Sequence, residues 1–228
     1  MRLNKYIAQS TGMSRRAADS AIADGRVTVN GSAPTAGQQV LPTASVTLDG
    51  RAITPSVNTH TILLNKPIGY ICSRNGQGSR TIYELLPPDL RALKPVGRLD
   101  KDSSGLLLLT NDGDLAHRLT HPSFQKIKRY DITLDKPLAP LHRQMISDHG
   151  IELADGNSRL IIERPDFIPR HITVKDPEHF WHVSMREGRN RQIRRTFEAL
   201  GYTVQRLHRT HFGTYELKHT QTGKYREV

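Results

Sequence analysis

The feature that most constrains the fold is an uninterrupted apolar run, residues 106–109, near the middle of the 228-residue chain. A short apolar run bounded by turn residues predicts a strand that is buried on both faces. Directly before it, the segment 97–105 holds Asp100 and Asp102 between two terminal glycines, which permit backbone geometry that a side chain would block. We therefore expect Asp100 to lie in a loop held by a rigid strand, a usual position for reactive groups. A charged surface turn is the alternative interpretation.

The composition indicates a polyanionic partner. Lys and Arg outnumber Asp and Glu by 33 to 22, which gives a formal net charge of +11. Such an excess favours nucleic acid, whereas an anionic membrane would require a long basic amphipathic helix, which the sequence lacks. No apolar segment approaches the roughly 20 residues of a membrane span. A single cysteine, Cys72, excludes an internal disulfide and a thiolate zinc cluster, so we expect a cytoplasmic protein.

Residues 1–55 predict a compact module of two helices and short strands. The first helix is expected to end at Gly12, and Ser14 to cap a second helix with a buried stripe of Ala17, Ala18, Ala21 and Ile22. Strands are expected at 27–29 and 46–48, each followed by an Asn-Gly or Asp-Gly turn that tolerates positive φ angles. The polar residues 56–60 then predict a linker to a larger domain, residues 61–228.

Basic residues gather on the two predicted helices of this module, among them Lys5, Arg15 and Arg16. Arg15 and Arg16 lie in a first helical turn, where the helix dipole disfavours cations and a bound phosphate would offset that cost. These three residues are therefore candidates for RNA binding, and a solvated basic surface is the alternative.

In the larger domain, residues 126–134 alternate in the manner of a strand, which places Lys128 and Tyr130 on the same face. Residues 187–201 predict a helix with Asn190 as its N-cap, on which Arg191, Arg194 and Arg195 share a face. A basic face beside a helix N-terminus suits a carboxylate or a phosphate.

Smaller patterns complete the prediction. Lys66 is interpreted either as a phosphate contact or as a solvated turn residue, and Asp114 as the cap of a helix over 115–119. Further strands are expected at 160–162 and 172–174. His117 and His121 lie four residues apart, but no third ligand lies near them in the sequence, so we expect no metal site.

Taken together, these segments resemble the RsuA/RluB/RluE/RluF-type pseudouridine synthases, preceded by an S4-type RNA-binding domain. The resemblance is carried by Gly97-Arg98-Leu99-Asp100 with Asp102, Gly105-Leu106 and Asn111-Asp112-Gly113, by Lys128-x-Tyr130, by Gly188-Arg189-x-x-Gln192-Ile193-Arg194 and by Leu207-x-Arg209-x-x-x-Gly213. It implies that Asp100 is the essential catalytic residue, that Tyr130 stacks on the target base and that Arg194 pairs with Asp100. It also implies an apolar wall that includes Leu207, and RNA contacts from Arg98, Lys128 and Arg191.

The implied fold is α+β: a small S4-like module followed by a synthase domain with a mixed, mostly antiparallel central sheet. The implied reaction isomerises uridine to pseudouridine in ribosomal RNA, with large-subunit 23S RNA favoured over 16S RNA. It transfers neither electrons nor a group to another molecule, so no cofactor is expected. The Asp100 carboxylate could attack ribose C1′ or remove the C2′ proton, and the sequence does not distinguish these routes.

Two other functions are compatible with parts of the sequence. A non-catalytic RNA-binding or ribosome-assembly factor would use the same basic surfaces, and a carboxylate hydrolase could be built on Asp100 and Asp102. The hydrolase gives no reason for the arginine-rich segment 189–195. We expect a monomer.

Overall fold

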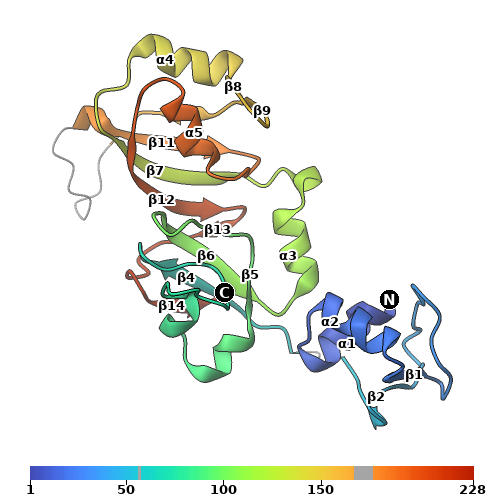
Figure 1. Ribbon diagram of the computed structural model, residues 1–228. Coiled ribbons are helices and arrows are strands. Elements are labelled where there is room, and N and C mark those ends of the chain that lie inside the picture. Colours follow the sequence, from blue (N-terminus) through green and yellow to red (C-terminus); the bar gives the residue numbers. More distant parts are fainter. Residues whose placement is uncertain (56–57, 167–176) are drawn as a thin grey trace. The chain divides into compact units, whose positions relative to one another are not determined.

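The computed structural model divides the chain into two compact units, Met1–His60 and Thr61–Val228. It describes residues 1–55, 58–166 and 177–228, so the strand expected at 172–174 lies outside the described residues. Figure 1 labels the elements of both units, and each unit is described here by itself.

The first unit packs two helices on a small antiparallel sheet. The helices are α1 (Leu3–Thr11) and α2 (Arg15–Ala23), and the sheet order is β1 (Val27–Val29), β2 (Val46–Leu48), β3 (Arg51–Ala52). Gly12 ends α1 in the left-handed conformation, and the Ser14 side chain accepts a hydrogen bond from the Ala17 backbone, as expected. Ala18 and Ala21 are buried in the core, but Ala17 is exposed, so its assignment to the buried stripe was wrong.

The second unit is built around a mixed sheet whose main path runs β10-β11-β7-β12-β6-β4-β14. The strands of this path are β4 (Thr61–Lys66), β6 (Ser104–Thr110), β7 (Lys128–Leu134), β10 (Ile161–Glu163), β11 (Phe180–Met185), β12 (Val204–Phe212) and β14 (Tyr225–Glu227). Two short strands extend it, because β5 (Lys94–Pro95) pairs with β6 and β13 (Tyr215–Glu216) pairs with β12. Neighbouring strands of the path are antiparallel except β6 and β12, which confirms the predicted mixed, mostly antiparallel sheet of an α+β fold.

The central strand β6 is buried along its whole length, as its leucine run predicts. Leu107 and Leu109 pack into the largest hydrophobic cluster of the unit, whereas Leu106 and Leu108 pack into a second cluster with Leu119. Because successive side chains of a strand point to opposite faces, two clusters can cover one strand only from both sides. This rigid strand follows the loop that carries Asp100.

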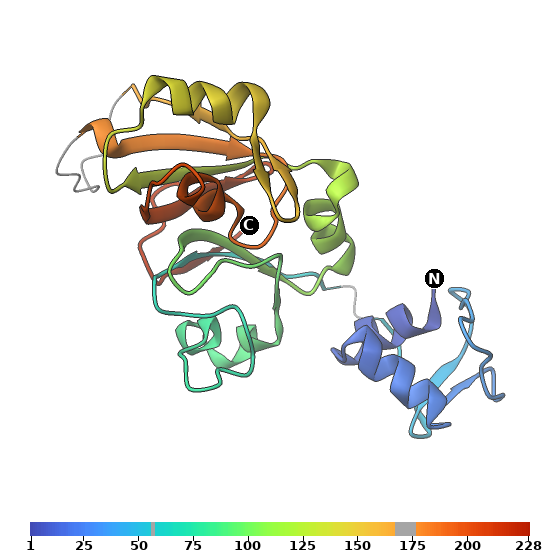
Figure 2. The ribbon, with the colours of Figure 1, turned by 45° about the horizontal axis from the view of Figure 1, so that its top comes forward.

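Helices cover the sheet unevenly. α3 (Gly113–Thr120) follows β6, while α4 (Pro140–Gln144) and α5 (Gln192–Glu198) lie by the half of the sheet that contains β11 and β7 (Figures 1 and 2). α4 continues into a π-helical turn, Met145–His149, and the hairpin β8 (Ile151–Leu153) and β9 (Gly156–Ser158) follows it. Short 3-10 helices fill the connections, at Ile82–Leu85, Pro88–Ala92, Pro122–Phe124 and Pro177–His179.

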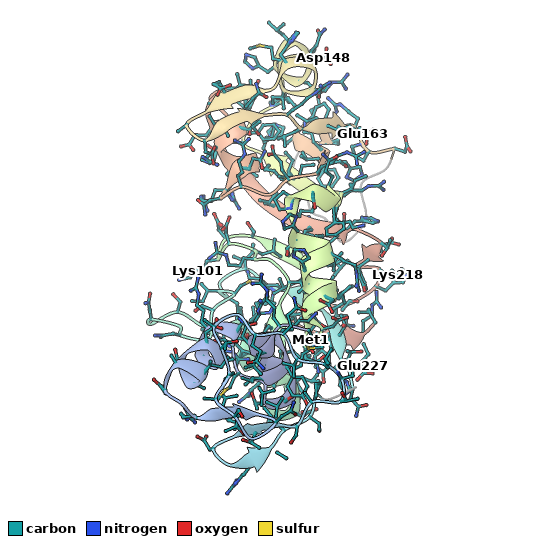
Figure 3. The ribbon with its side chains drawn as sticks, turned by 90° about the vertical axis from the view of Figure 1, so that its right-hand side faces the viewer. Met1, Lys101, Asp148, Glu163, Lys218 and Glu227 are labelled. Carbon is teal, nitrogen blue, oxygen red and sulfur yellow. The ribbon has the colours of Figure 1, made fainter. Side chains whose placement is uncertain are left out.

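One predicted cap needs correction. Asp112, rather than Asp114, caps α3, because its carboxylate accepts hydrogen bonds from the backbone amides of Asp114 and Leu115. The sequence offered two aspartates two residues apart, and the turn geometry selects the first. In the side view of Figure 3, Lys101, next to Asp100, and Lys218, near the C-terminal strand β14, lie on opposite sides of the unit. The surroundings of Asp100 are therefore formed by other elements.

Candidate active site

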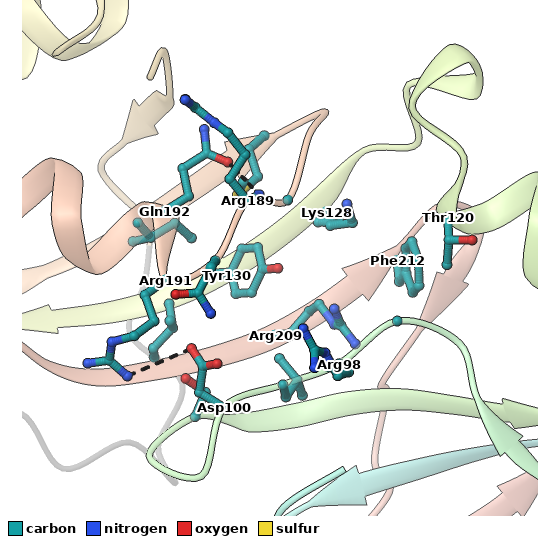
Figure 4. Close-up of a pocket in the computed structure, with 18 residues that line it drawn as sticks. Arg98, Asp100, Thr120, Lys128, Tyr130, Arg189, Arg191, Gln192, Arg209 and Phe212 are labelled. Atoms are coloured by element: carbon teal, nitrogen blue, oxygen red, sulfur yellow. Dashed lines mark hydrogen bonds and ion pairs between the residues drawn. The ribbon is translucent and has the colours of Figure 1, made fainter. Parts of the chain in front are cut away.

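A cavity of about 310 Å³ opens in the second unit beside Asp100. Two loops bound it, residues 97–103 before β6 and residues 186–191 before α5, and β7 and β12 contribute further side chains (Figure 4). Its described lining includes Arg98, Asp100, Lys128, Tyr130, Arg191 and Leu207, all of them residues that the sequence singled out. We call the two segments the aspartate loop (97–103) and the arginine loop (186–191).

The aspartate loop is held from beneath by Lys66, at the end of β4. The Lys66 side chain is fully buried, and its Nζ donates to the backbone oxygens of Asp100 at 2.9 Å, Ser103 at 2.7 Å and Pro67 at 3.1 Å. Burial lowers the pKa of this ammonium, which nearby Asp100 and Asp102 counteract. Both interpretations of Lys66 from the sequence were wrong, since the residue is neither solvated nor open to a phosphate.

The end of the same loop fits tightly against β12. Gly105 has a φ of +102°, and a Cβ atom there would lie 2.2 Å from the backbone oxygen of Arg209. Only glycine satisfies both demands, the positive φ and the close approach of a second backbone. This contact is where the parallel pairing of β6 and β12 occurs, with Gly105 opposite Arg209.

Two arginines reach the aspartate loop from the other side of the cavity. Arg191 Nη1 lies 3.9 Å from Asp100 Oδ2 and 3.1 Å from Asp102 Oδ2. Arg194 lies 3.2 Å from Asp102 Oδ2 through Nε and donates to the Asp102 backbone oxygen at 2.9 Å. Burial lowers the pKa of Arg194, and the charge of Asp102 opposes that shift.

The expected pair of Arg194 with Asp100 is therefore wrong, because Arg191 makes the ion pair with Asp100. Arg191 lies at the N-cap of α5 with a φ of +48°, outside the regular helix, and Asn190 is not the cap. This left-handed turn directs Arg191 toward Asp100, whereas Arg194, one turn into α5, reaches only Asp102. Arg195 leaves the shared face altogether and bonds Asp155.

The arginine loop is held by side chains that the sequence did not single out. The buried Gln192 accepts a hydrogen bond from the Arg189 amide at 3.1 Å, and its Nε2 donates to Ser158 Oγ at 3.1 Å and to the Glu187 carboxylate. Arg189 donates to three successive backbone oxygens at the β8–β9 turn: those of Asp155, Gly156 and Asn157. Bonding to Arg195 lowers the pKa of the Asp155 carboxyl.

Strand β7 supplies Lys128 and Tyr130 to the cavity, both on the face that their spacing predicts. Tyr130 lies opposite Arg209 of β12 and is 7% exposed. Lys128 Nζ donates to the Glu187 backbone oxygen at 2.9 Å, and burial together with the charge of Arg209 lowers its pKa to about 8. Leu207 is buried and belongs to the apolar part of the lining, whereas Arg98 is exposed at the rim.

The remaining predicted site residues lie elsewhere. Lys5 is on α1, and Arg15 and Arg16 are exposed at the start of α2, all in the first unit. No metal site is found at His117 and His121, whose rings contact each other at 4.7 Å, and the described residues hold no group of three or more metal-ligating side chains. In the same part of the chain, no helix has the length and apolar character needed to cross a membrane.

Sequence reasoning missed Lys66 and Asp155, and noted Arg209 only as part of a motif. Lys66 follows a buried strand and precedes a proline, so its side chain could have been expected to remain within the fold. Nothing local marks Asp155, because its partners Arg189 and Arg195 are more than thirty residues away.

Two family models match the chain. One, described as RNA pseudouridylate synthase, covers residues 60–199, and the other, the S4 domain, covers residues 1–46. Each match falls largely within one of the two units.

Curated relatives are similar over the whole chain. The chain is 36% identical over 237 residues to the ribosomal large subunit pseudouridine synthase B of Pseudomonas aeruginosa, covering 100% of the chain and 59% of that relative. It is 36% identical over 231 residues to the ribosomal small subunit pseudouridine synthase A of Salmonella typhimurium, covering 100% of the chain and 96% of that relative. It spans less than half, 44%, of the synthase B of Xanthomonas campestris.

A solved structure shares the fold. The crystal structure of a pseudouridylate synthase matches with a TM-score of 0.68 and 29% sequence identity, and the match covers 100% of this chain and 96% of the other.

Proposed function

Because this chain belongs to the RNA pseudouridylate synthase family, we propose that it isomerises uridine to pseudouridine in ribosomal RNA, with Asp100 as its catalytic residue. The observation that supports this most is the shared cavity, which Asp100 lines together with Tyr130 and a set of cations. The reaction breaks the bond from ribose C1′ to uracil N1, turns the base and forms a bond from C1′ to C5, while the C5 proton leaves.

The Asp100 carboxylate begins either route. It attacks C1′ as a nucleophile or removes the C2′ proton as a base, and in both cases it must face the ribose from a fixed position. Lys66 and β6 provide that fixed position, since three backbone acceptors around Asp100 share one buried ammonium. The exposed rim of the cavity leaves a way in for a nucleotide that has left its stack.

The other cavity residues orient the nucleotide. Tyr130 offers a ring for the extruded base, and stacking returns about 1–3 kcal/mol of the unstacking cost. Arg191, ion-paired to Asp100 and Asp102, aligns the two carboxylates, and Arg194 acts on Asp100 only through Asp102. Leu207 packs beside the base in the apolar part of the cavity.

We propose 23S RNA of the large subunit as the substrate, on the resemblance of the segment 188–195 to the large-subunit synthases. Relatives named for the large subunit, the small subunit and dual specificity share 36%, 36% and 34% identity with the chain, so the identities do not separate these substrates. Lys5, Arg15 and Arg16 of the S4 unit would contribute contacts to RNA phosphates. Since one chain supplies the whole lining of the cavity, we propose a cytoplasmic monomer that needs no cofactor.

The test compares carbodiimide-reactive pseudouridines in 16S and 23S RNA from cells with and without the gene. Asp100→Asn, supplied on a plasmid, is expected to restore no missing pseudouridine. Asp102→Asn is the matched control, since it removes a neighbouring carboxylate that also bonds Arg191; it is expected to restore the modification at a reduced rate.

Two results would contradict the proposal. An unchanged pseudouridine map in cells without the gene would remove the rRNA substrate. Full restoration by Asp100→Asn would leave the non-catalytic RNA-binding or ribosome-assembly factor as the better description.

A further inference from the structure

The charges that line the cavity are strongly unbalanced. The described lining contains five cationic side chains and one carboxylate, that of Asp100; the cations are Arg98, Lys128, Arg189, Arg191 and Arg209. Arg191 pairs with Asp100 and Asp102, and Arg189 pairs with Asp155 and Glu187. Within the described part of the chain, no carboxylate lies at ion-pair distance from the other three cations.

Arg209 is the most constrained of these three. The side chain is 2% exposed, and its Nε donates to the Leu106 backbone oxygen at 2.8 Å. Its Nη2 is buried and has no hydrogen-bond acceptor among the described residues. A buried guanidinium nitrogen without an acceptor carries a desolvation cost, which an anionic ligand in the adjoining cavity would remove.

The sheet brings Lys128 beside Arg209. The residue two positions from Lys128, Tyr130, is paired with Arg209, and Lys128 itself is paired with Phe212. A register shift between Arg209 and His211 adds one residue to β12, and as a result Arg209 and Phe212 both line the cavity although they are three residues apart. The Phe212 ring supports both cations, with Arg209 Cζ at 4.9 Å and Lys128 Nζ at 5.5 Å from its centroid.

Lys128 keeps hydrogen-bonding capacity for a ligand. Its ammonium has three donors, and the described contacts use one, to the Glu187 backbone oxygen. A Cβ at Gly188 would come within 2.8 Å of Lys128 Nζ, so the glycine leaves room for the amine. In the view of Figure 4, Arg98, Lys128 and Arg209 lie to the right of Tyr130, whereas Arg191 and its bond to Asp100 lie to the left.

We propose that the end of the cavity formed by Arg98, Lys128 and Arg209 is an anion subsite that holds a backbone phosphodiester of the RNA, next to the uridine bound at Tyr130 and Asp100. This inference rests on the function proposed above. A uridine that leaves its stack stays attached to its strand, so a phosphodiester must enter the cavity mouth with it. The two ends of the cavity then have separate tasks: Asp100 acts on the ribose, and the three cations hold the backbone.

The binding test uses two probes that differ by the phosphodiester, namely uridine and the dinucleotide uridylyl-3′,5′-uridine. Affinities are measured by NMR on protein labelled with ¹³C-lysine, with the Lys128 resonance assigned from Lys128→Met. We expect the dinucleotide to bind about 10-fold more tightly than uridine, the ratio that one charge-assisted hydrogen bond provides. We also expect it to raise the pH at which Lys128 titrates, because a bound anion favours the ammonium.

Variants assign the preference to the subsite. Lys128→Met and the exposed Arg98→Gln are each expected to reduce the ratio of the two affinities several-fold, with circular dichroism used to verify folding. Lys136→Met is the matched control for net charge: Lys136 follows β7, is exposed and contacts the Tyr202 ring outside the cavity lining. It is expected to preserve the ratio.

The outcomes separate this inference from the proposed function. Equal affinities for the two probes, a Lys128 resonance that does not respond to the dinucleotide, or a ratio that falls equally in Lys136→Met would overturn the subsite. None of these results depends on turnover, so a subsite that fails while Asp100→Asn abolishes pseudouridine formation would leave the synthase assignment standing. A subsite that succeeds while Asp100→Asn restores the product would remove only the catalytic role.

Discussion

Two loops meet at the cavity, and they are held by different kinds of bonds. The aspartate loop is fixed by the buried ammonium of Lys66, whose three acceptors are neutral backbone oxygens, and by the close approach of Gly105 to β12. The arginine loop is fixed by the amide of Gln192 and by ion pairs to Asp155, a carboxylate at the surface.

The difference teaches where this protein places its rigidity. Buried donors and backbone contacts are costly to disturb, because the groups left behind cannot turn to water, whereas exposed ion pairs are screened and contribute little. The loop that carries the proposed catalytic carboxylate is thus expected to be rigid, and the loop that carries Arg191 to be more adaptable. Four substitutions, taken from the largest expected effect to the smallest, test this comparison.

A glycine in each loop region gives the sharpest contrast. Gly105→Ala places a Cβ 2.2 Å from a backbone oxygen at a positive φ, so we expect a loss of about 4 kcal/mol in the free energy of unfolding. Gly188→Ala meets only the flexible end of Lys128, which can move, so its stability is expected to stay close to that of the parent. Urea unfolding of both variants checks this order, and equal losses would refute it.

Lys66→Met removes the donor beneath the aspartate loop. Three backbone oxygens lose a hydrogen bond, and we expect about 3 kcal/mol less stability together with a large fall in kcat. Lys101→Met is the control, because Lys101 is an exposed lysine of the same loop that donates to Ser79 Oγ at 3.2 Å. Similar unfolding midpoints for the two variants would mean that the buried bonds contribute little.

Gln192→Ala is expected to loosen the arginine loop, at a cost of about 2 kcal/mol, because the Arg189 amide and Ser158 lose their partner. The expected kinetic signature is a higher KM for RNA, since Arg189 and Arg191 lie in the loop that moves. The exposed Gln144→Ala on α4 serves as the control. A fall in kcat with KM unchanged would instead place the rigid requirement in this loop.

Asp155→Asn is expected to have the smallest effect on stability, and that effect depends on pH. The bond from Arg195 lowers the pKa of Asp155 below its ordinary value of 3.8, so the folded state binds fewer protons than the unfolded state in this range. The stabilisation is therefore present above pH 3.8 and is lost as the pH falls through the lowered pKa. Thermal unfolding of both proteins should show a gap at pH 7 that closes in acid, and a constant gap would contradict the ion-pair explanation.

Some features of the fold follow from local chemistry and could be predicted. The alternation in 126–134 predicted the shared face of Lys128 and Tyr130, and Ser14 predicted the start of α2, because both depend on neighbours within a few residues. The caps of α3 and α5 were predicted at the wrong residue by one or two positions. Competing polar side chains stood close together there, and the final turn geometry decided between them.

The order of residues by itself determined the buried central strand, the helix and hairpin signals of the first unit and the class of partner, since apolar runs, caps and net charge act locally or as a sum. Tertiary structure alone decided which charges meet. Arg191 rather than Arg194 approaches Asp100, Lys66 is buried beneath the aspartate loop, and Arg209 lacks a carboxylate partner. These pairings join segments up to about a hundred residues apart, and no local pattern encodes how a left-handed turn or a shifted register will direct a side chain.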